Sequence, residues 1–306
     1  MTEKVVIIGS GPAGYTAAIY ATRDALDPIL IRGFEAGGQL MLTSEVENFP
    51  AFKSILGPDL MDSMYEQVKA LGCRVVDGNV TKVDLGTYPY RIWAGDKEYQ
   101  TYSIIIATGA SAKWLGLEKE KELIGKGVSG CAVCDGPFFR NKDVVVVGGG
   151  DSAMEDALYL STLTKSVTLV HRRKEFRASK IMQERVFANK KIRVIFDSEV
   201  TRVLGDGHVT GVEVTSKING EKTHLKTDGL FIAIGHYPNT DLFKGQLDID
   251  ENGYVVTHDS VKTSREGVFA AGDVQDRVYK QAVIAAGWGS MAAIDARKFL
   301  EEKKLA

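Results

Sequence analysis

The sequence predicts an α/β fold made of two Rossmann-like, three-layer dinucleotide-binding domains, the second inserted into the first. The prediction depends on an internal repeat. A continuous apolar run leads into a glycine-rich turn at residues 5–14 and again at residues 144–153. Each copy closes with an apolar segment that ends in glycine, at residues 105–109 and 232–235. Two dinucleotide-binding folds of similar length in one chain explain this repeat.

The end of the chain indicates that the first domain is discontinuous. Residues 239–306 are too few for a third nucleotide fold. They contain an apolar strand pattern at 267–274 and a helical pattern at 281–300. We therefore expect residues 243–306 to complete a first domain begun by residues 1–116, with residues 117–242 inserted. The segments 112–117 and 236–243 would connect the two domains.

Composition excludes several classes of protein. Of the 306 residues, 44% are hydrophobic and 25% are charged, and the net charge is −2. A nucleic-acid-binding protein usually carries a strongly basic surface, so no nucleic acid is expected as a partner. The first residues lead straight into a strand pattern, and no apolar run approaches membrane-spanning length. We therefore expect a cytoplasmic protein with no membrane partner.

The first glycine motif has the context of a nucleotide site. Residues 5–8 predict a buried parallel strand, and residues 15–26 predict a helix rich in alanine. Gly9, Gly11 and Gly14 lie between them, where glycine lets the backbone approach a pyrophosphate at the helix N-terminus. The second strand, 28–31, is followed by Arg32 where an acidic residue would bind the adenosine ribose. Glu35 is the nearest acid, and we expect it to bind the ribose instead.

Two further stretches add to the first site. A long, polar, glycine-rich segment at 37–50 does not have the character of a simple connection between core elements. The strand pattern at 103–110 ends in small residues that let a flat or bulky group approach. Asp273, at the end of the strand pattern near the C-terminus, is placed to hydrogen-bond a polyol.

The second glycine motif leads to a basic cluster. A strand at 143–147, a helix at 153–162 and a strand at 166–170 surround the motif. His171, Arg172, Arg173 and Arg177 follow that second strand, at the place where an NAD site would have an acid. Positive charge there suits the 2′-phosphate of NADP, so the sequence favours NADPH over NADH.

A Cys-x-x-Cys pair precedes the second glycine motif. Cys131 and Cys134 can close and reopen a small disulfide ring, and the adjacent Asp135 can exchange the proton that thiol chemistry requires. A zinc site would need a second pair of ligands, and neither Cys73 nor the five histidines have ligand spacing. No metal is therefore expected, and Cys73 is interpreted as a buried apolar residue.

Together these segments resemble the low-molecular-weight, flavin-dependent thioredoxin reductases over nearly the whole chain. The shared motifs occur in the family's order at residues 9–14, 37–40, 131–136, 171–177 and 271–274. The resemblance implies a homodimer with FAD in the discontinuous domain and NADPH in the inserted domain. It also implies that hydride passes from NADPH to FAD, then to the Cys131–Cys134 disulfide, and by dithiol exchange to thioredoxin. Cys134 would face the flavin, and Cys131 would attack thioredoxin. Asp135 matches the family's acid.

The nucleotide-site residues follow from the motifs and the resemblance. Those expected at FAD are Gly9, Gly11, Pro12, Ala13, Gly14, Glu35, Gly38, Gln39, Leu40, Thr43, Asn48, Ala107, Thr108, Gly109, Gly272, Asp273, Gln281 and Ala282. Those expected at NADPH are Gly148, Gly150, Asp151, Ser152, Ala153, His171, Arg172, Arg173, Arg177, Ile234 and Gly235. Gly130, Ala51 and Lys280 depart from the family's usual residues, which bears on partner preference and the flavin site.

Other functions remain open at this stage. A related flavin disulfide reductase could use another electron donor or a different thioredoxin-like acceptor. A dithiol oxidase would pass electrons to oxygen without needing NADPH. A flavin-dependent ferredoxin–NADP reductase would lack the dithiol. A non-catalytic nucleotide-sensing module is a further class, and a colourless preparation would favour it.

Overall fold

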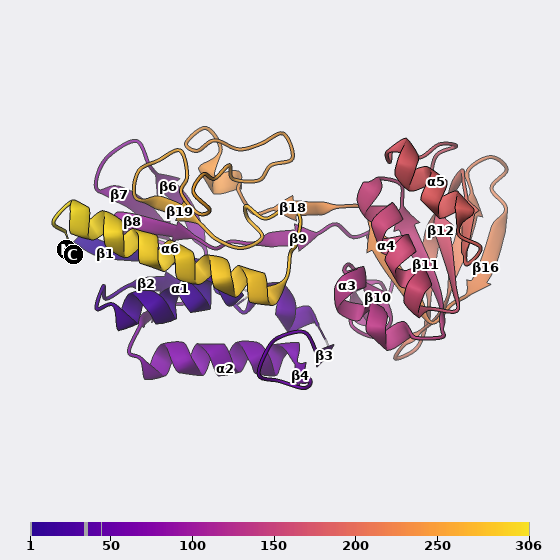
Figure 1. The fold of residues 1–306 in the computed structure, drawn as a ribbon, viewed down its shortest axis with the longest axis horizontal. Coiled ribbons are helices and arrows are strands. Elements are labelled where there is room, and N and C mark those ends of the chain that lie inside the picture. Colours follow the sequence, from indigo (N-terminus) through magenta and orange to yellow (C-terminus); the bar gives the residue numbers. More distant parts are fainter. Residues whose placement is uncertain (1, 34–35, 44, 306) are drawn as a thin grey trace. The chain divides into compact units, whose positions relative to one another are not determined.

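The computed structural model describes residues 2–33, 36–43 and 45–305 and divides into two compact units (Figure 1). Unit 1 comprises Met1–Ser111 and Tyr237–Ala306, and unit 2 comprises Ala112–His236. The division falls a few residues before the expected boundaries at 116/117 and 242/243. Two short strands, β9 (Ala110–Ala112) and β18 (His236–Pro238), pair where the chain passes between the units.

Unit 1 is built on a sheet with a parallel core. Strand β8 (Lys97–Ile106) lies between β1 (Thr2–Ile8) and β19 (Val268–Ala270), and β2 (Ile29–Ile31) and β5 (Arg74–Val76) continue beyond β1. The first half of β8 also pairs antiparallel with β7 (Tyr90–Ala94), which pairs with β6 (Val80–Asp84). A small hairpin, β3 (Glu45–Val46) with β4 (Ile55–Leu56), lies outside this sheet.

Side-chain alternation along β1 explains why both faces of this sheet are buried. Val5 and Ile7 belong to a core shared with the alanine-rich faces of α1 (Pro12–Arg23) and α6 (Ala282–Glu302). Val6 and Ile8 point into a second core, which the β6–β7 hairpin and the segment around Phe243 and Val255 cover. A strand with two buried faces reads as a continuous apolar run, as the sequence shows. Helix α2 (Gly57–Ala70) packs beside α1 (Figure 1).

Unit 2 repeats the topology of unit 1. Its five parallel strands run in the order β10 (Val128–Ser129), β17 (Gly229–Ala233), β11 (Asp143–Gly148), β12 (Ser166–Val170) and β13 (Ile192–Ile195). The corresponding order in unit 1 is β19, β8, β1, β2, β5. The internal repeat in the sequence therefore corresponds to a repeat of strand order, and the α/β class with Rossmann-like domains is confirmed.

Both faces of the unit 2 sheet are covered. Helices α4 (Asp151–Leu163) and α5 (Lys180–Ala188) and the short α3 (Ala132–Asp135) pack on one face. The antiparallel sheet of β14 (Ser198–Gly205), β15 (Val209–Ser216) and β16 (Lys222–Lys226) covers the other. The sequence analysis missed this sheet and the β6–β7 hairpin. Short 3-10 turns complete the chain at Gly38–Leu42 (η1), Lys121–Leu123, Gly136–Phe139 (η3) and Asp241–Phe243.

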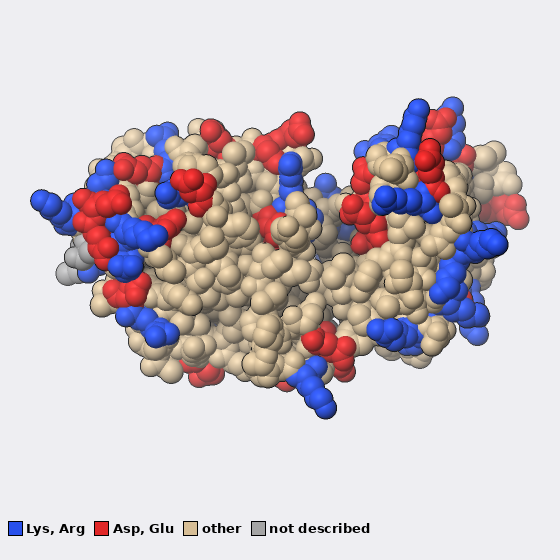
Figure 2. Space-filling view, in the orientation of Figure 1, with Lys and Arg blue, Asp and Glu red and all other residues tan. Residues whose placement is uncertain are grey.

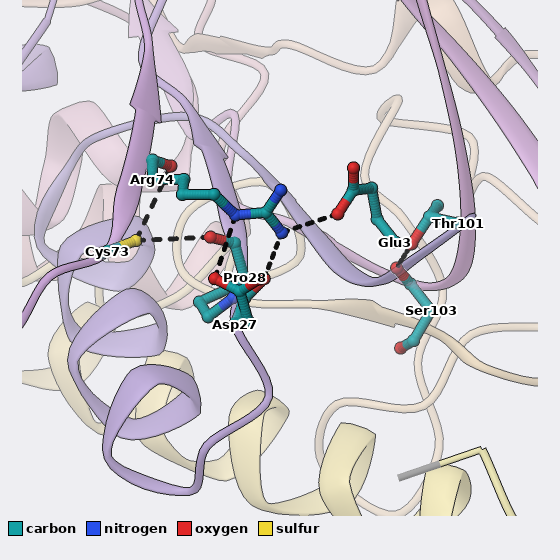
Figure 3. A network of polar contacts seen from close by, with 7 residues as sticks. All are labelled: Glu3, Asp27, Pro28, Cys73, Arg74, Thr101 and Ser103. Atoms are coloured by element: carbon teal, nitrogen blue, oxygen red, sulfur yellow. Dashed lines mark hydrogen bonds and ion pairs between the residues drawn. The ribbon is translucent and has the colours of Figure 1, made fainter. Parts of the chain in front are cut away.

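Ion pairs connect residues at the amino ends of three strands of unit 1, β1, β2 and β5 (Figure 3). Arg74, at the start of β5, donates to the Glu3 carboxylate of β1 at 2.6 Å and to Asp27 Oδ1 at 3.0 Å. Cys73 is 9% exposed, and its sulfur lies 3.7 Å from the Pro28 carbonyl oxygen. Cys73 is therefore a core residue at the sheet edge opposite the carboxyl ends of the strands.

The surface carries both signs of charge. Figure 2 shows lysine and arginine interspersed with aspartate and glutamate on each unit, in keeping with the small net charge. Across the part of the chain that the structure describes, none of the helices has the length and apolar character needed to cross a membrane.

Candidate active site

The Cys-x-x-Cys pair forms a disulfide at the start of a short helix. Cys131 and Cys134 are joined, with their Cα atoms 5.4 Å apart. Cys131 is the N-cap of α3, and its sulfur accepts a hydrogen bond from the Cys134 N–H at 3.2 Å. A hydrogen bond to this sulfur favours its thiolate form once the disulfide is reduced. The sequence motif is therefore a redox-competent pair in this structure.

Ser129 links the disulfide to the neighbouring carboxyl group. Its hydroxyl is buried, accepts the Cys131 N–H at 3.0 Å, and lies 3.2 Å from the Cys131 carbonyl oxygen. Burial raises the pKa of the nearby Asp135 carboxyl group, and the Ser129 hydroxyl partly opposes this rise. The sequence analysis missed Ser129, and its position two residues before a cysteine was the only available signal.

The dithiol segment packs directly on the second nucleotide motif's helix. A Cβ atom on Gly136 would lie 3.1 Å from side-chain atoms of both Tyr159 and Leu160 on α4. Glycine at this position lets α3 and η3 approach α4 closely. The disulfide is thus held by the same helix whose N-terminus carries the second glycine motif.

The first glycine motif leaves space at the N-terminus of α1. A Cβ atom on Gly9 would overlap the Ala107 carbonyl, and one on Gly14 would overlap the Gly9 carbonyl. Gly11, the N-cap, faces open space, and no side chain caps the helix. Uncapped N–H groups beside open space suit a pyrophosphate, so these residues fit the flavin nucleotide that the sequence predicts.

Other residues expected at FAD lie around this turn. A Cβ atom on Gly38 would lie 3.5 Å from Gly11 Cα, and one on Gly272 would lie 3.0 Å from the Ala13 Cβ. The Asn48 amide donates to the Gln281 side chain at 3.3 Å, although the two residues are far apart in sequence. The remaining expected residues lie on or beside these elements: Pro12 begins α1, Gln39 and Leu40 are in η1, Thr43 follows it, and Ala282 begins α6.

Arg32, at the place where an acid would bind the adenosine ribose, has partners within the protein. Its guanidinium lies 3.9 Å from the centre of the Tyr65 ring and pairs with Asp77 at 3.5 Å. Glu35, the expected ribose ligand, lies outside the described residues.

Three polar residues that the sequence analysis missed position the loops of this site. Ser10 donates to the Arg32 carbonyl at 2.6 Å and accepts the Gly37 N–H at 3.2 Å. Asn239 exchanges hydrogen bonds with Thr108, at 2.8 Å in each direction, and its N–H donates to the Gly109 carbonyl. Asp276 accepts the N–H groups of residues 278–280, just before Gln281. Each lies in or beside a predicted motif, but its residue type alone does not indicate its role.

Asp273 is an unusual carboxyl group. Burial, with the negative charge of Asp276 adding to it and Lys280 opposing it, raises the pKa of Asp273 to about 7. Near neutral pH this side chain therefore interconverts between a hydrogen-bond donor and an acceptor. Either form can hydrogen-bond a polyol hydroxyl, which is the role that the sequence predicts for Asp273.

The second glycine motif reproduces the geometry of the first. A Cβ atom on Gly148 would lie 2.5 Å from the Ala233 carbonyl oxygen, as one on Gly9 would overlap that of Ala107. Gly150 is the uncapped N-cap of α4 and faces open space. Ala153 replaces the third glycine, and Ser152 lies between it and Asp151 in the first turn. The motif therefore also fits a pyrophosphate.

The basic segment follows β12 beside this motif. His171 is 5% exposed, its ring lies where any side chain on Gly149 would be, and its Nε2 is 3.0 Å from the Glu175 carbonyl oxygen. Burial, the main cause, lowers the pKa of His171. The His171 side chain therefore contributes to the packing of the basic segment. Arg172, Arg173 and Arg177 are exposed, and among the described residues no hydrogen bond or ion pair occupies their guanidinium groups.

Three expected NADPH residues have other features. The Asp151 carboxylate accepts two hydrogen bonds from Ser179, which lies just beyond the basic segment. Ile234 is 37% exposed at the end of β17, and Gly235 has a φ of 103° that favours glycine.

Comparisons with known proteins agree over the whole chain. A family profile described as pyridine nucleotide-disulphide oxidoreductase matches residues 3–289. A thioredoxin reductase from Rickettsia conorii is 53% identical over 308 residues, covering 99% of both chains. The solved thioredoxin reductase from Streptococcus pyogenes is 40% identical, with a TM-score of 0.95 over 98% of this chain and 99% of that chain. The one from Giardia duodenalis is 42% identical, with a TM-score of 0.94 over 98% of this chain and 100% of that chain.

Removal of Ser129 should shift the titration of Asp135. In Ser129→Ala the interaction with the hydroxyl that lowers the Asp135 pKa is lost, so this pKa should rise further. The dithiol would be reduced chemically, separated from reductant, and mixed with an aromatic disulfide by stopped flow across pH. The part of the pH–rate profile that reports the Asp135 titration is the limb that is absent in Asp135→Asn. In Ser129→Ala this limb should move to higher pH. Ser129→Thr, which keeps the hydroxyl, should leave the limb in place. An unmoved limb in Ser129→Ala contradicts the assignment.

Asp273 should make the flavin-free protein less stable at high pH. Its folded pKa of about 7 exceeds the unfolded value near 3.8, so its contribution to stability is present at low pH and is lost between these two values. From pH 4 to pH 8 the loss should reach about 4 kcal/mol relative to Asp273→Asn. Urea unfolding of both proteins at several pH values measures this difference. Parallel pH dependence of the two proteins would refute it.

Proposed function

This chain belongs to the low-molecular-weight thioredoxin reductases of the pyridine nucleotide-disulphide oxidoreductase family, and from that premise we propose that it uses NADPH to reduce the disulfide of thioredoxin or of a thioredoxin-like protein. One observation carries the proposal. The Cys131–Cys134 disulfide lies beside a carboxyl group of raised pKa, in a unit that also holds a glycine motif and three exposed arginines.

Unit 1 would bind FAD and unit 2 NADPH. FAD, when bound, supplies the ring that accepts a hydride from NADPH and delivers two electrons to the disulfide. The uncapped N-terminus of α1 around Gly11 would hold its pyrophosphate, and Asp273 a polyol hydroxyl. Asn48 and Gln281 would fix the loops on which they lie.

The preference for NADPH is supported by free positive charge. Arg172, Arg173 and Arg177 follow β12, where the adenosine ribose of a dinucleotide is recognised. Guanidinium groups that have no hydrogen bond or ion pair to another described residue can bind a 2′-phosphate with two parallel hydrogen bonds. NADH lacks that phosphate and would leave the three charges uncompensated.

The chemistry of the reduced pair is a dithiol exchange. The Cys131 thiolate attacks one sulfur of the thioredoxin disulfide, and the other sulfur leaves and takes a proton. Cys134, as its thiolate, then attacks the Cys131 sulfur, which reforms the internal disulfide and releases the second thioredoxin thiol. The hydrogen bond from the Cys134 N–H to the Cys131 sulfur supports Cys131 as the attacking residue. Asp135, with its raised pKa, is placed to supply the proton.

The resemblance also supports a homodimer working in the cytoplasm. Neither property enters the chemistry above.

Anaerobic titration with NADPH tests the electron path. Purified flavin-bound protein should lose its visible absorption and consume two NADPH per flavin, because flavin and disulfide each accept one hydride equivalent. Cys134→Ser should consume only one. The matched control, Cys73→Ser, alters the buried third cysteine and should still consume two. Unchanged absorption with NADPH would contradict the assigned electron donor. Consumption of only one NADPH per flavin by the unmodified protein would mean that the disulfide does not receive electrons from the flavin.

A further inference from the structure

We propose that Asp151 and Ser179 form a positioning pair that makes unit 2 selective for the 2′-phosphate of its coenzyme, acting through Arg177. The inference rests on the proposed NADPH site and deepens it. The motif had suggested Asp151 as a direct coenzyme ligand, but the structure directs its carboxylate elsewhere.

The pair connects the two halves of the coenzyme site. Asp151 is the first residue of α4, directly after the glycine turn, and Ser179 directly precedes α5, two residues after Arg177. Asp151 Oδ1 accepts the Ser179 N–H at 2.9 Å and the Ser179 hydroxyl at 2.7 Å. The same two bonds are the main cause of the lowered pKa of Asp151. The carboxylate is therefore ionised, and both of its hydrogen bonds are charge-assisted.

The Ser179 hydroxyl bonds Asp151 instead of capping α5. It occupies the N-cap of α5, where a serine hydroxyl normally accepts a backbone N–H of the first turn. In this structure it makes no side-chain cap hydrogen bond and donates to Asp151 instead. The local preference of α5 is thus overridden by a longer-range contact to the glycine turn.

Backbone bonds strengthen the same junction. The N–H groups of Arg177 and Ala178 both donate to the Gly149 carbonyl, at 2.8 and 3.2 Å. The buried His171 ring lies against Gly149, where a Cβ atom would overlap it. Arg177 is therefore anchored between the glycine turn on one side and the Asp151–Ser179 contact on the other.

Charge explains why an acid is tolerated at this position. A carboxylate in the first turn of α4 lies near the place proposed for the coenzyme pyrophosphate, and two anions there would repel each other. Two donors from Ser179 satisfy the carboxylate and hold it on the side of the basic segment. Its negative charge then contributes to the position of Arg177 rather than to pyrophosphate binding.

Two ligands that differ only in the 2′-phosphate test the proposal. Binding of adenosine 2′,5′-bisphosphate and of 5′-AMP to the flavin-bound protein would be measured by calorimetry. Asp151→Ala and Ser179→Ala should each weaken the bisphosphate about five-fold or more, with less than a two-fold change for 5′-AMP. The double variant should be no weaker than Asp151→Ala alone, because Asp151→Ala already removes both bonds, whereas Ser179→Ala removes only the bond from the hydroxyl. Ser179→Thr, which keeps the hydroxyl, should bind the bisphosphate normally.

Equal weakening of both ligands, additive losses or no change would overturn the positioning role. Arg177→Ala is the separate control for the coenzyme site itself. If it weakens the bisphosphate while Asp151→Ala does not, the pair is excluded and the proposed NADPH site stands. If Arg177→Ala leaves the bisphosphate affinity unchanged, Arg177 does not bind the 2′-phosphate and the pair's role fails, and if Arg172→Ala and Arg173→Ala also leave it unchanged, this part of the proposed function fails as well.

Discussion

Close packing of a glycine against a strand carbonyl is the constraint on which both nucleotide sites depend. Gly9 in unit 1 and Gly148 in unit 2 leave no room for a side chain beside Ala107 and Ala233. This contact brings the start of the following helix to the carboxyl edge of the sheet. The N-cap glycine then faces open space and leaves the helix N-terminus to a ligand. A larger residue at Gly9 or Gly148 would move the turn, the helix and the polar residues attached to them.

The redox centre depends on the same scaffold. The disulfide segment packs through Gly136 on α4, the helix that begins at the second nucleotide motif. Burial that comes with this packing raises the pKa of Asp135, and Ser129 limits the rise while holding the Cys131 backbone. The disulfide, the Asp135 carboxyl group and the proposed nucleotide site of unit 2 thus depend on one packed sheet and the helices on its face. The exposed Arg172, Arg173 and Arg177 follow β12 of that sheet.

Much of this arrangement could be predicted because its signals are local in sequence. The apolar strands, the glycine turns and the Cys-x-x-Cys pair each occupy a few consecutive residues, and their repeat anticipated the repeated strand order. Ser129, Asn239 and Asp276 could not be predicted, since their roles arise from contacts that folding brings together. The bond between the Asp151 carboxylate and Ser179 illustrates the same limit, because the two residues are far apart in the sequence. The helix predicted at 15–26 begins earlier, at Pro12, because proline suits the first helical turn.

The stoichiometry of NADPH oxidation against thioredoxin reduction tests the central claim most directly. The flavin-bound protein would be mixed with NADPH and limiting oxidised thioredoxin, and NADPH loss, new thiols and hydrogen peroxide would be measured together. The account predicts two thioredoxin thiols for each NADPH consumed, with no peroxide and almost no NADPH loss when thioredoxin is omitted. NADPH consumption that continues without thioredoxin and yields one peroxide per NADPH would contradict it and indicate an oxidase.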